Sequence, residues 1–300
     1  MNKQYKADLA LIFVTLAWGL SFILTKNSLD ALSTFNFLAI RFFVAALSIT
    51  MIFYRSILKL DQMTFKYGVI IGTIMFSAFA LQTLGLNYTT ASKSAFISSL
   101  CVVLVPIFSS LFLKKIPKPA SIIGVILSAI GLGLLTLDGN LSLNIGDLLS
   151  LLCAIAFTFQ ILSISKYSVQ VNTVNLAFVQ ICVVSLLSGI TSFLFETPTF
   201  PATQKVWLDI LFLSLFCTSG AFIVQNTAQK YTSATHAALI FTGEPVFAAI
   251  FGYILCGEIL SIRGFIGGFL IVFSMLLAEL EVKIPFLNTK EKSPIIAHKK

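Results

Sequence analysis

The sequence predicts an all-α integral membrane protein with ten transmembrane helices, arranged as two inverted repeats of five helices each. Three observations predict this fold class: an apolar composition, ten apolar segments of membrane-spanning length, and an internal repeat. The 300 residues are 57% hydrophobic and only 11% charged, with a mean hydropathy of +0.97. Soluble domains are about 45–50% apolar and about 25% charged, so the composition excludes an ordinary soluble protein.

Ten segments have the length and composition of membrane spans, which need roughly 20 mostly apolar residues. They fall at about 8–26, 35–54, 67–87, 92–113, 120–137, 146–165, 174–195, 207–227, 235–256 and 263–280. Charged residues, proline and glycine separate them, most clearly at 55–66 and 197–201. The segment 8–26 follows a basic N-terminus as a signal peptide does, but it lacks a small-residue cleavage site and nine more spans follow. We therefore interpret it as the first transmembrane helix.

The basic residues predict the orientation, because loops rich in Lys and Arg stay in the cytoplasm. With ten spans, fifteen Lys and Arg residues fall on one side of the membrane and four on the other. We expect a multi-pass protein of the cell membrane with both termini cytoplasmic and a disordered cytoplasmic tail at 281–300. The basic residues flank apolar segments and do not form one basic face, so nucleic acid is not an expected partner.

An internal repeat relates the two halves of the chain. Residues 82–137 align with residues 225–280 at an offset of 143, and the earlier part of each half aligns at an offset of 139. Each half contains five spans, an odd number, so the second half must enter the membrane from the opposite side. We expect a first repeat at 7–137 and a second at 146–280. Secondary transporters share this architecture and bind substrate near the midplane between the repeats.

Glu244 lies near the middle of the apolar segment 235–256, where a charged side chain is unfavourable unless it faces a cavity or a partner. Pro245 follows it and removes a backbone hydrogen bond, which frees the carbonyl of Phe241. Two interpretations of Glu244 remain open. It is either a substrate contact or protonatable site, or a structural carboxyl bonded to neighbouring helices.

Arg41 lies about one and a half turns inside the segment 35–54. It binds an anionic group, pairs with an acid of the bundle, or extends its side chain to the outer interface. We assign gating or structural roles to Arg41, Pro106 and Pro245.

Uncharged polar residues at membrane depth complete the candidate substrate site. Together with Glu244 the predicted substrate-binding residues are Trp18, Ser21, Gln82, Ser99, Gln160, Gln225 and Glu244. Gln82 and Gln225 occupy equivalent positions in the repeat, which places both near the axis between the halves. Each of these residues, taken alone, is also a candidate for interhelical hydrogen bonding.

Features of an enzyme are scarce. The five cysteines show no CxxC or CxxH spacing, and the sequence contains no Walker A motif, no DxxD and no HExxH. We expect no catalytic residue, no metal site and no cofactor. A membrane-embedded enzyme and a non-transporting sensor or helper are the alternative functions. Glycines within 120–137 and 263–280 predict close helix packing, and a homodimer through these faces is an alternative that the sequence leaves open.

Four groups of residues form a recognisable pattern. They are Ala-Trp-Gly-Leu-Ser-Phe at 17–22 with Lys26, Arg-Phe at 41–42, Tyr-Thr-Thr-Ala-Ser at 88–92 with Val-Pro at 105–106, and Glu-Pro-Val-Phe-Ala-Ala at 244–249 with Gly-Glu at 257–258. Over about residues 7–280 the sequence resembles the EamA family of the drug/metabolite transporter superfamily. It departs from that pattern at 114–115, where Lys-Lys replaces the frequent Lys-Glu.

The resemblance implies a fold and a function. The family has ten helices in two inverted repeats and transports small metabolites, often exporting amino acids or related compounds. Its central cavity is lined mainly by the helices that correspond here to 8–26, 67–87, 92–113, 146–165, 207–227 and 235–256. We therefore expect a secondary transporter of a small molecule that works by alternating access in the lipid bilayer.

Overall fold

The computed structural model describes residues 3–89, 91–114, 117, 119–136, 144–256 and 261–279. The described residues fold into α-helices joined by short turns, with one 3-10 helix, one π-helix and no strand among them. The expected tail at 281–300 and the motif residues Thr90, Lys115, Gly257 and Glu258 lie outside these ranges.

Both halves of the chain form a succession of apolar helices. The first half contains α1 (Lys3–Leu29), α2 (Thr34–Ile57), α3 (Gln62–Leu86), α4 (Ala91–Ser99), α5 (Cys101–Phe112) and α6 (Pro119–Thr136). The second half contains α7 (Ile145–Tyr167), η1 (Ser168–Gln170), α8 (Thr173–Phe195), α9 (Gln204–Phe212), the π-helix η2 (Leu213–Gly220), α10 (Ala221–Ala228), α11 (Ala234–Phe241), α12 (Gly243–Cys256) and α13 (Ile262–Glu279).

Seven helices in the described part of the chain are long and apolar enough to cross a membrane, and three shorter apolar helices accompany them. Two of the expected segments are interrupted, and a third changes its helix type. The segment 92–113 breaks at Leu100 between α4 and α5, and 235–256 breaks at Thr242 between α11 and α12. Pro245 lies in the first turn of α12, where a helix tolerates a residue without a backbone N–H. The third segment, 207–227, runs through α9, η2 and α10 as one span with a π-helical centre.

Polar side chains begin several helices by accepting hydrogen bonds from the free N–H groups of the first turn. Asp61 accepts from the backbone N and the Oγ1 of Thr64 at 2.8 and 2.6 Å. These bonds favour the charged carboxylate and lower the pKa of Asp61 below its usual value of 3.8. Asn144 and Asp147 form a reciprocal capping box at the start of α7.

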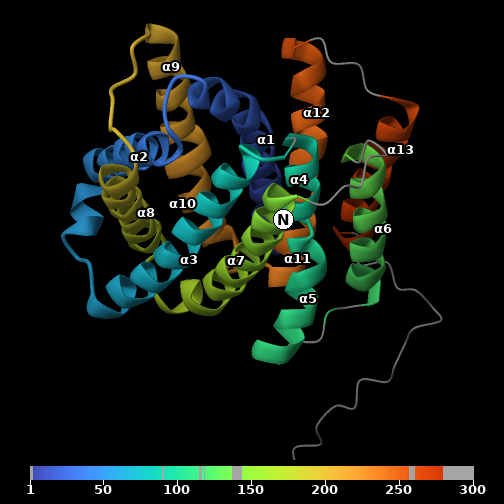
Figure 1. Cartoon of the computed structure of the whole chain (residues 1–300). Helices are drawn as coiled ribbons and strands as arrows, with labels where there is room; N and C mark the ends of the chain where they lie inside the picture. The colour runs from blue at the N-terminus through green and yellow to red at the C-terminus, as the bar shows by residue number, and fades with distance from the viewer. Residues whose placement is uncertain are drawn as a thin grey trace, which may run out of the picture.

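The two halves pack against each other along their whole length. α2 packs on α8 and α6 packs on α13, and these pairs stand at opposite sides of the molecule (Figure 1). α1 contacts α10, α11 and α12, while α7 contacts α3, α4 and α5. Every one of these contacts has a counterpart when the halves are exchanged, so α1 and α7 occupy equivalent central positions.

Glycines bring α6 and α13 into close contact inside one chain. A Cβ atom added at Gly267 would lie 2.5 Å from the carbonyl oxygen of Gly131 and 2.6 Å from the backbone N of Leu135. No side chain fits at that distance, so a hydrogen at this position lets the two backbones meet. These two glycines are therefore used by contacts within the chain.

Glu196, at the C-terminal end of α8, caps the N-terminus of α2. Its Oε1 accepts from the backbone N of Phe35 at 3.0 Å, and its Oε2 accepts from the backbone N of Asn36 and from Ser33 Oγ, both at 2.8 Å. A carboxylate at a helix N-terminus is favourable because it satisfies free N–H groups and opposes the helix dipole. This contact joins the two halves at one end of the molecule.

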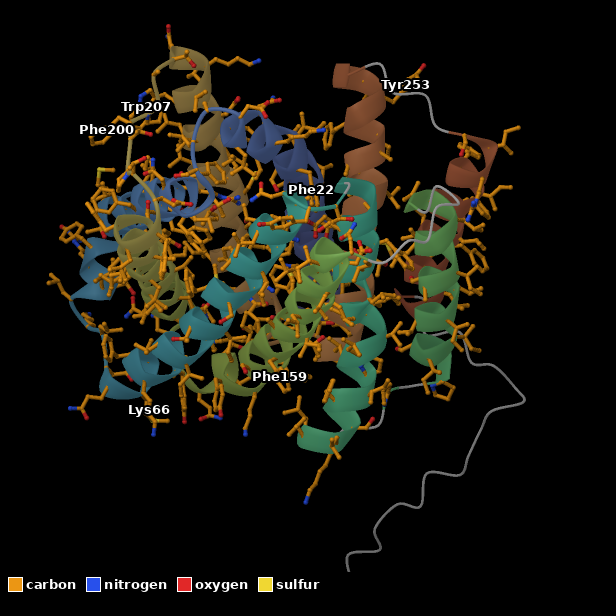
Figure 2. The ribbon with its side chains drawn as sticks, in the orientation of Figure 1. Phe22, Lys66, Phe159, Phe200, Trp207 and Tyr253 are labelled. Atoms are coloured by element: carbon orange, nitrogen blue, oxygen red, sulfur yellow. The ribbon has the colours of Figure 1, made fainter. Side chains whose placement is uncertain are left out.

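Lys66 lies at one end of the bundle, and Phe200 and Trp207 lie at the other (Figure 2). Because Trp is enriched at membrane–water interfaces and Lys in cytoplasmic loops, the axis between these ends is the direction expected for the membrane normal.

Candidate functional site

A cavity of about 90 Å³ lies at the centre of the bundle, where helices of both halves meet. It is bounded by α1, α2, α3, α4 and α5 from the first half and by α7, α10, α11 and α12 from the second. A buried water needs at least about 10–15 Å³ of such space, so the cavity has room for several waters or for a small solute.

All seven residues predicted to bind substrate line this cavity. They are Trp18, Ser21, Gln82, Ser99, Gln160, Gln225 and Glu244. Arg41 lines it as well, whereas Pro106 and Pro245 are not among the lining residues. The prediction located these side chains because a polar group at membrane depth is unfavourable against lipid and therefore faces the interior. Their roles in substrate binding, and the roles assigned to the two prolines, stay predictions.

Two of the amides are joined across the second half. Gln160 Nε2 on α7 donates to Gln225 Oε1 on α10 at 3.4 Å, and both side chains are almost completely buried. Gln82, the repeat equivalent of Gln225, reaches the same cavity from α3. Three helices therefore each contribute one amide to the cavity wall.

Six phenylalanines also line the cavity, and the sequence analysis did not single them out among 29. They are Phe22, Phe37, Phe79, Phe157, Phe222 and Phe241. Three of them precede a lining glutamine by three positions, in the pattern Phe-x-x-Gln at 79–82, 157–160 and 222–225. Residues three apart share one helix face, so this recurring pattern was a signal in the sequence that could have identified them.

Arg41 is held inside the bundle. Its side chain is only 3% exposed, and its Nε donates to Thr218 Oγ1 at 2.9 Å. The guanidinium carbon lies 5.7 Å from the ring centroids of both Phe42 and Phe79. The alternative in which Arg41 extends to the outer interface is therefore wrong.

The partner of Arg41 belongs to the π-helix η2, which the sequence analysis missed. Ser214 Oγ donates to the carbonyl of Arg41 at 2.8 Å, and Ser219 Oγ donates to the carbonyl of Ala45 at 3.0 Å. π-helical turns are rare and occur frequently at functional sites. The signal for this contact was the cluster of hydroxyl residues at 214–219 in an otherwise apolar span.

Glu244 reaches the cavity from the first turn of α12, directly after the helix break. α1 approaches this turn closely, because a Cβ atom added at Gly19 would lie 2.6 Å from Phe247 Cβ and 3.0 Å from the carbonyl oxygen of Glu244. Among the residues that the structure describes, the Glu244 carboxylate has neither a hydrogen bond nor an ion pair. Glu244 is half-buried and lines the cavity.

Comparisons with known proteins agree on one family. The EamA-like transporter family matches residues 5–137 and again residues 144–280. The chain is 38% identical over 280 residues to an uncharacterized transporter of Archaeoglobus fulgidus, covering 93% of this chain and 88% of that protein. It is 26% identical over 311 residues to the uncharacterized transporter YyaM of Bacillus subtilis, covering 98% of this chain and all of that protein.

The fold is also similar to that of a solved structure. A protein of known crystal structure superposes with a TM-score of 0.79, covering 92% of this chain and 97% of that one at 18% sequence identity. At this identity the similarity concerns the fold alone.

Proposed function

We propose that this chain, which belongs to the EamA-like transporter family, is a secondary transporter that moves a small metabolite across the cytoplasmic membrane by alternating access. Family membership and the span-length apolar helices make it a multi-pass membrane protein. The proposed cargo is an amino acid or a related compound, and the proposed direction is export.

The observation that carries the proposal is the central cavity. It is small, lies between the two halves, and combines polar side chains with phenylalanines in its lining. Alternating access needs one site that two rigid halves enclose and then open to either side. A cavity lined by helices of both halves meets that requirement. When the halves rock against each other, the cavity opens to one side or the other while its lining residues stay the same.

Two observations support an inverted repeat of ten spans. The family matches the chain twice, in halves of similar length. The helix contacts map onto each other when the halves are exchanged, including α2 with α8 and α6 with α13. In this proposal the three shorter apolar helices complete the ten spans, and both termini lie in the cytoplasm.

Counterflow in proteoliposomes tests the function. Vesicles loaded with an unlabelled neutral amino acid are diluted into a trace of the same labelled compound, and we expect the label to accumulate transiently inside. Vesicles without protein are the matched control. Chemical analysis of the recovered label separates transport from enzymatic conversion, because a transported compound is unchanged.

The contrary result is also specific. If no neutral amino acid or related metabolite accumulates, and none raises the thermal stability of the purified protein, the proposed cargo class is wrong. Uptake into inside-out membrane vesicles tests the direction, because an exporter accumulates its cargo in them.

A further inference from the structure

Two oppositely charged side chains face the central cavity, and they are the two charged residues among its lining residues. They come from different halves of the chain, Arg41 from α2 and Glu244 from α12. A buried charge is normally paired, because desolvation without a partner is strongly unfavourable. The partners of these two groups therefore decide what the cavity can hold.

The guanidinium of Arg41 is only partly used by the protein. Nε donates to Thr218 Oγ1, and this is the hydrogen bond that the side chain makes among the described residues. The terminal nitrogens Nη1 and Nη2 keep four N–H donors without an acceptor there. Arg presents such donors in a planar fork that matches the two oxygens of a carboxylate.

Glu244 is in the complementary situation. Its carboxylate has no hydrogen-bond or ion-pair partner among the described residues, and the residue lines the cavity. Arg41 and Glu244 do not form an ion pair with each other. The cavity is thus lined by one basic and one acidic side chain, and neither has an ion-pair partner among the described residues.

From this geometry we infer that Arg41 and Glu244 form the two ends of a binding site for a zwitterionic substrate, with the carboxylate at Arg41 and the ammonium group at Glu244. This inference rests on the proposed transport function and narrows its substrate class. It also gives Arg41 a direct binding role in place of the gating or structural role expected from the sequence.

The remaining lining residues suit the uncharged part of such a substrate. Trp18 packs at 5.6 and 5.2 Å from the ring centroids of Phe222 and Phe241, which gives the cavity an apolar wall. A lone carboxylate would leave Glu244 without a partner in the cavity, and a lone amine would leave Arg41 without one. The site therefore selects against both.

Thr218 acts as a positioning residue for Arg41. Its hydroxyl accepts the hydrogen bond from Nε and thereby holds one edge of the guanidinium. Since Ser214 in the same π-helix bonds the backbone carbonyl of Arg41, both ends of this residue are held by η2. Position 218 therefore needs a hydroxyl that accepts the hydrogen bond of Arg41, whatever the shape of the rest of its side chain.

The experiment compares three compounds that share the same branched four-carbon chain: valine, isobutylamine, which lacks the carboxylate, and 3-methylbutanoate, which lacks the ammonium group. Binding to purified protein is measured by thermal shift and by competition against counterflow of the labelled amino acid that the proteoliposomes accumulate. We expect valine to bind at least about tenfold more tightly than either analogue. This comparison uses the unaltered protein, so it does not depend on whether a variant folds.

Variants then assign each charge to its half of the substrate. Arg41→Gln is expected to lower the affinity for valine to that for isobutylamine, while the affinity for isobutylamine stays unchanged. Glu244→Gln is expected to weaken valine to the affinity of 3-methylbutanoate. Thr218→Val is expected to lower the affinity for valine severalfold. Thr218→Ser, which keeps the hydroxyl, is expected to bind valine as the unaltered protein does.

The outcomes separate the inference from the function on which it rests. If the protein transports a metabolite with a single charge or none, and Arg41→Gln transports it equally well, the zwitterion site is wrong while the transporter stands. Equal losses for all three compounds in Arg41→Gln would make Arg41 structural and also overturn the inference. If no compound crosses the membrane at all, the proposed function itself fails.

Discussion

The indole Nε1 of Trp18 donates a hydrogen bond of 2.9 Å to the backbone carbonyl of Cys217. Trp18 lies on α1 in the first half of the chain, and Cys217 lies in the π-helix η2 of the second. In a membrane every backbone carbonyl needs a partner from the protein or from water in a cavity. The bond therefore connects α1, which lines the cavity, to η2, whose Ser214 and Thr218 form hydrogen bonds with Arg41.

Replacement of this indole should cost stability. Trp18→Phe keeps an aromatic ring beside Phe222 and Phe241 but removes the donor to Cys217, and we expect the free energy of unfolding to fall by about 1 kcal/mol. Thermal denaturation in detergent measures the change. Trp207→Phe, at the end of the molecule (Figure 2), is the matched control, and an equal effect of the two substitutions would contradict the prediction.

Glu244→Gln should impair transport more than it impairs expression. The amide has nearly the same shape as the carboxylate but carries no charge toward the cavity, and we expect the transport rate per folded molecule to drop by about tenfold or more, which corresponds to ~1.4 kcal/mol. Counterflow normalised to the folded protein recovered by size-exclusion chromatography measures it. Parallel losses of folded protein and of activity would instead assign Glu244 a structural role.

Glu196→Gln should show the opposite pattern. Glu196 accepts hydrogen bonds from Ser33, Phe35 and Asn36 at the start of α2, away from the cavity lining. Loss of the charge at this helix N-terminus is expected to lower the free energy of unfolding by about 1 kcal/mol. Thermal unfolding and normalised counterflow are measured together. A tenfold loss of transport with unchanged stability would show that this contact belongs to the transport cycle.

Gly267→Ala should separate α6 from α13. The new Cβ would lie 2.5 Å from the carbonyl oxygen of Gly131, so the backbones must move apart, and we expect a loss of about 1–3 kcal/mol. Gly189→Ala is the matched control, because no atom lies within 4 Å of its added Cβ. A helical Gly→Ala change in open space is neutral or stabilising by up to about 1 kcal/mol. Equal stability of the two variants would rule out the close contact.

Much of the candidate site could be predicted from the sequence because the protein is surrounded by lipid. Polar residues inside long apolar segments must face inward, whichever helix they meet there. Gln82, Gln160 and Gln225 could thus be assigned to the interior without knowledge of their neighbours. Three lining phenylalanines outside the Phe-x-x-Gln pattern, Phe22, Phe37 and Phe241, could not, because an apolar side chain is equally stable against lipid and against another helix.

The sequence by itself determined that the chain belongs in a membrane, where its apolar segments lie, and which polar residues stand at depth. Only the tertiary structure decided how these residues meet. Arg41 and Thr218 are 177 positions apart, and their contact depends on helix packing and on the π-helical turn that sets the face of η2. No local sequence pattern encodes which face of η2 meets Arg41, because that depends on how one half of the chain packs against the other.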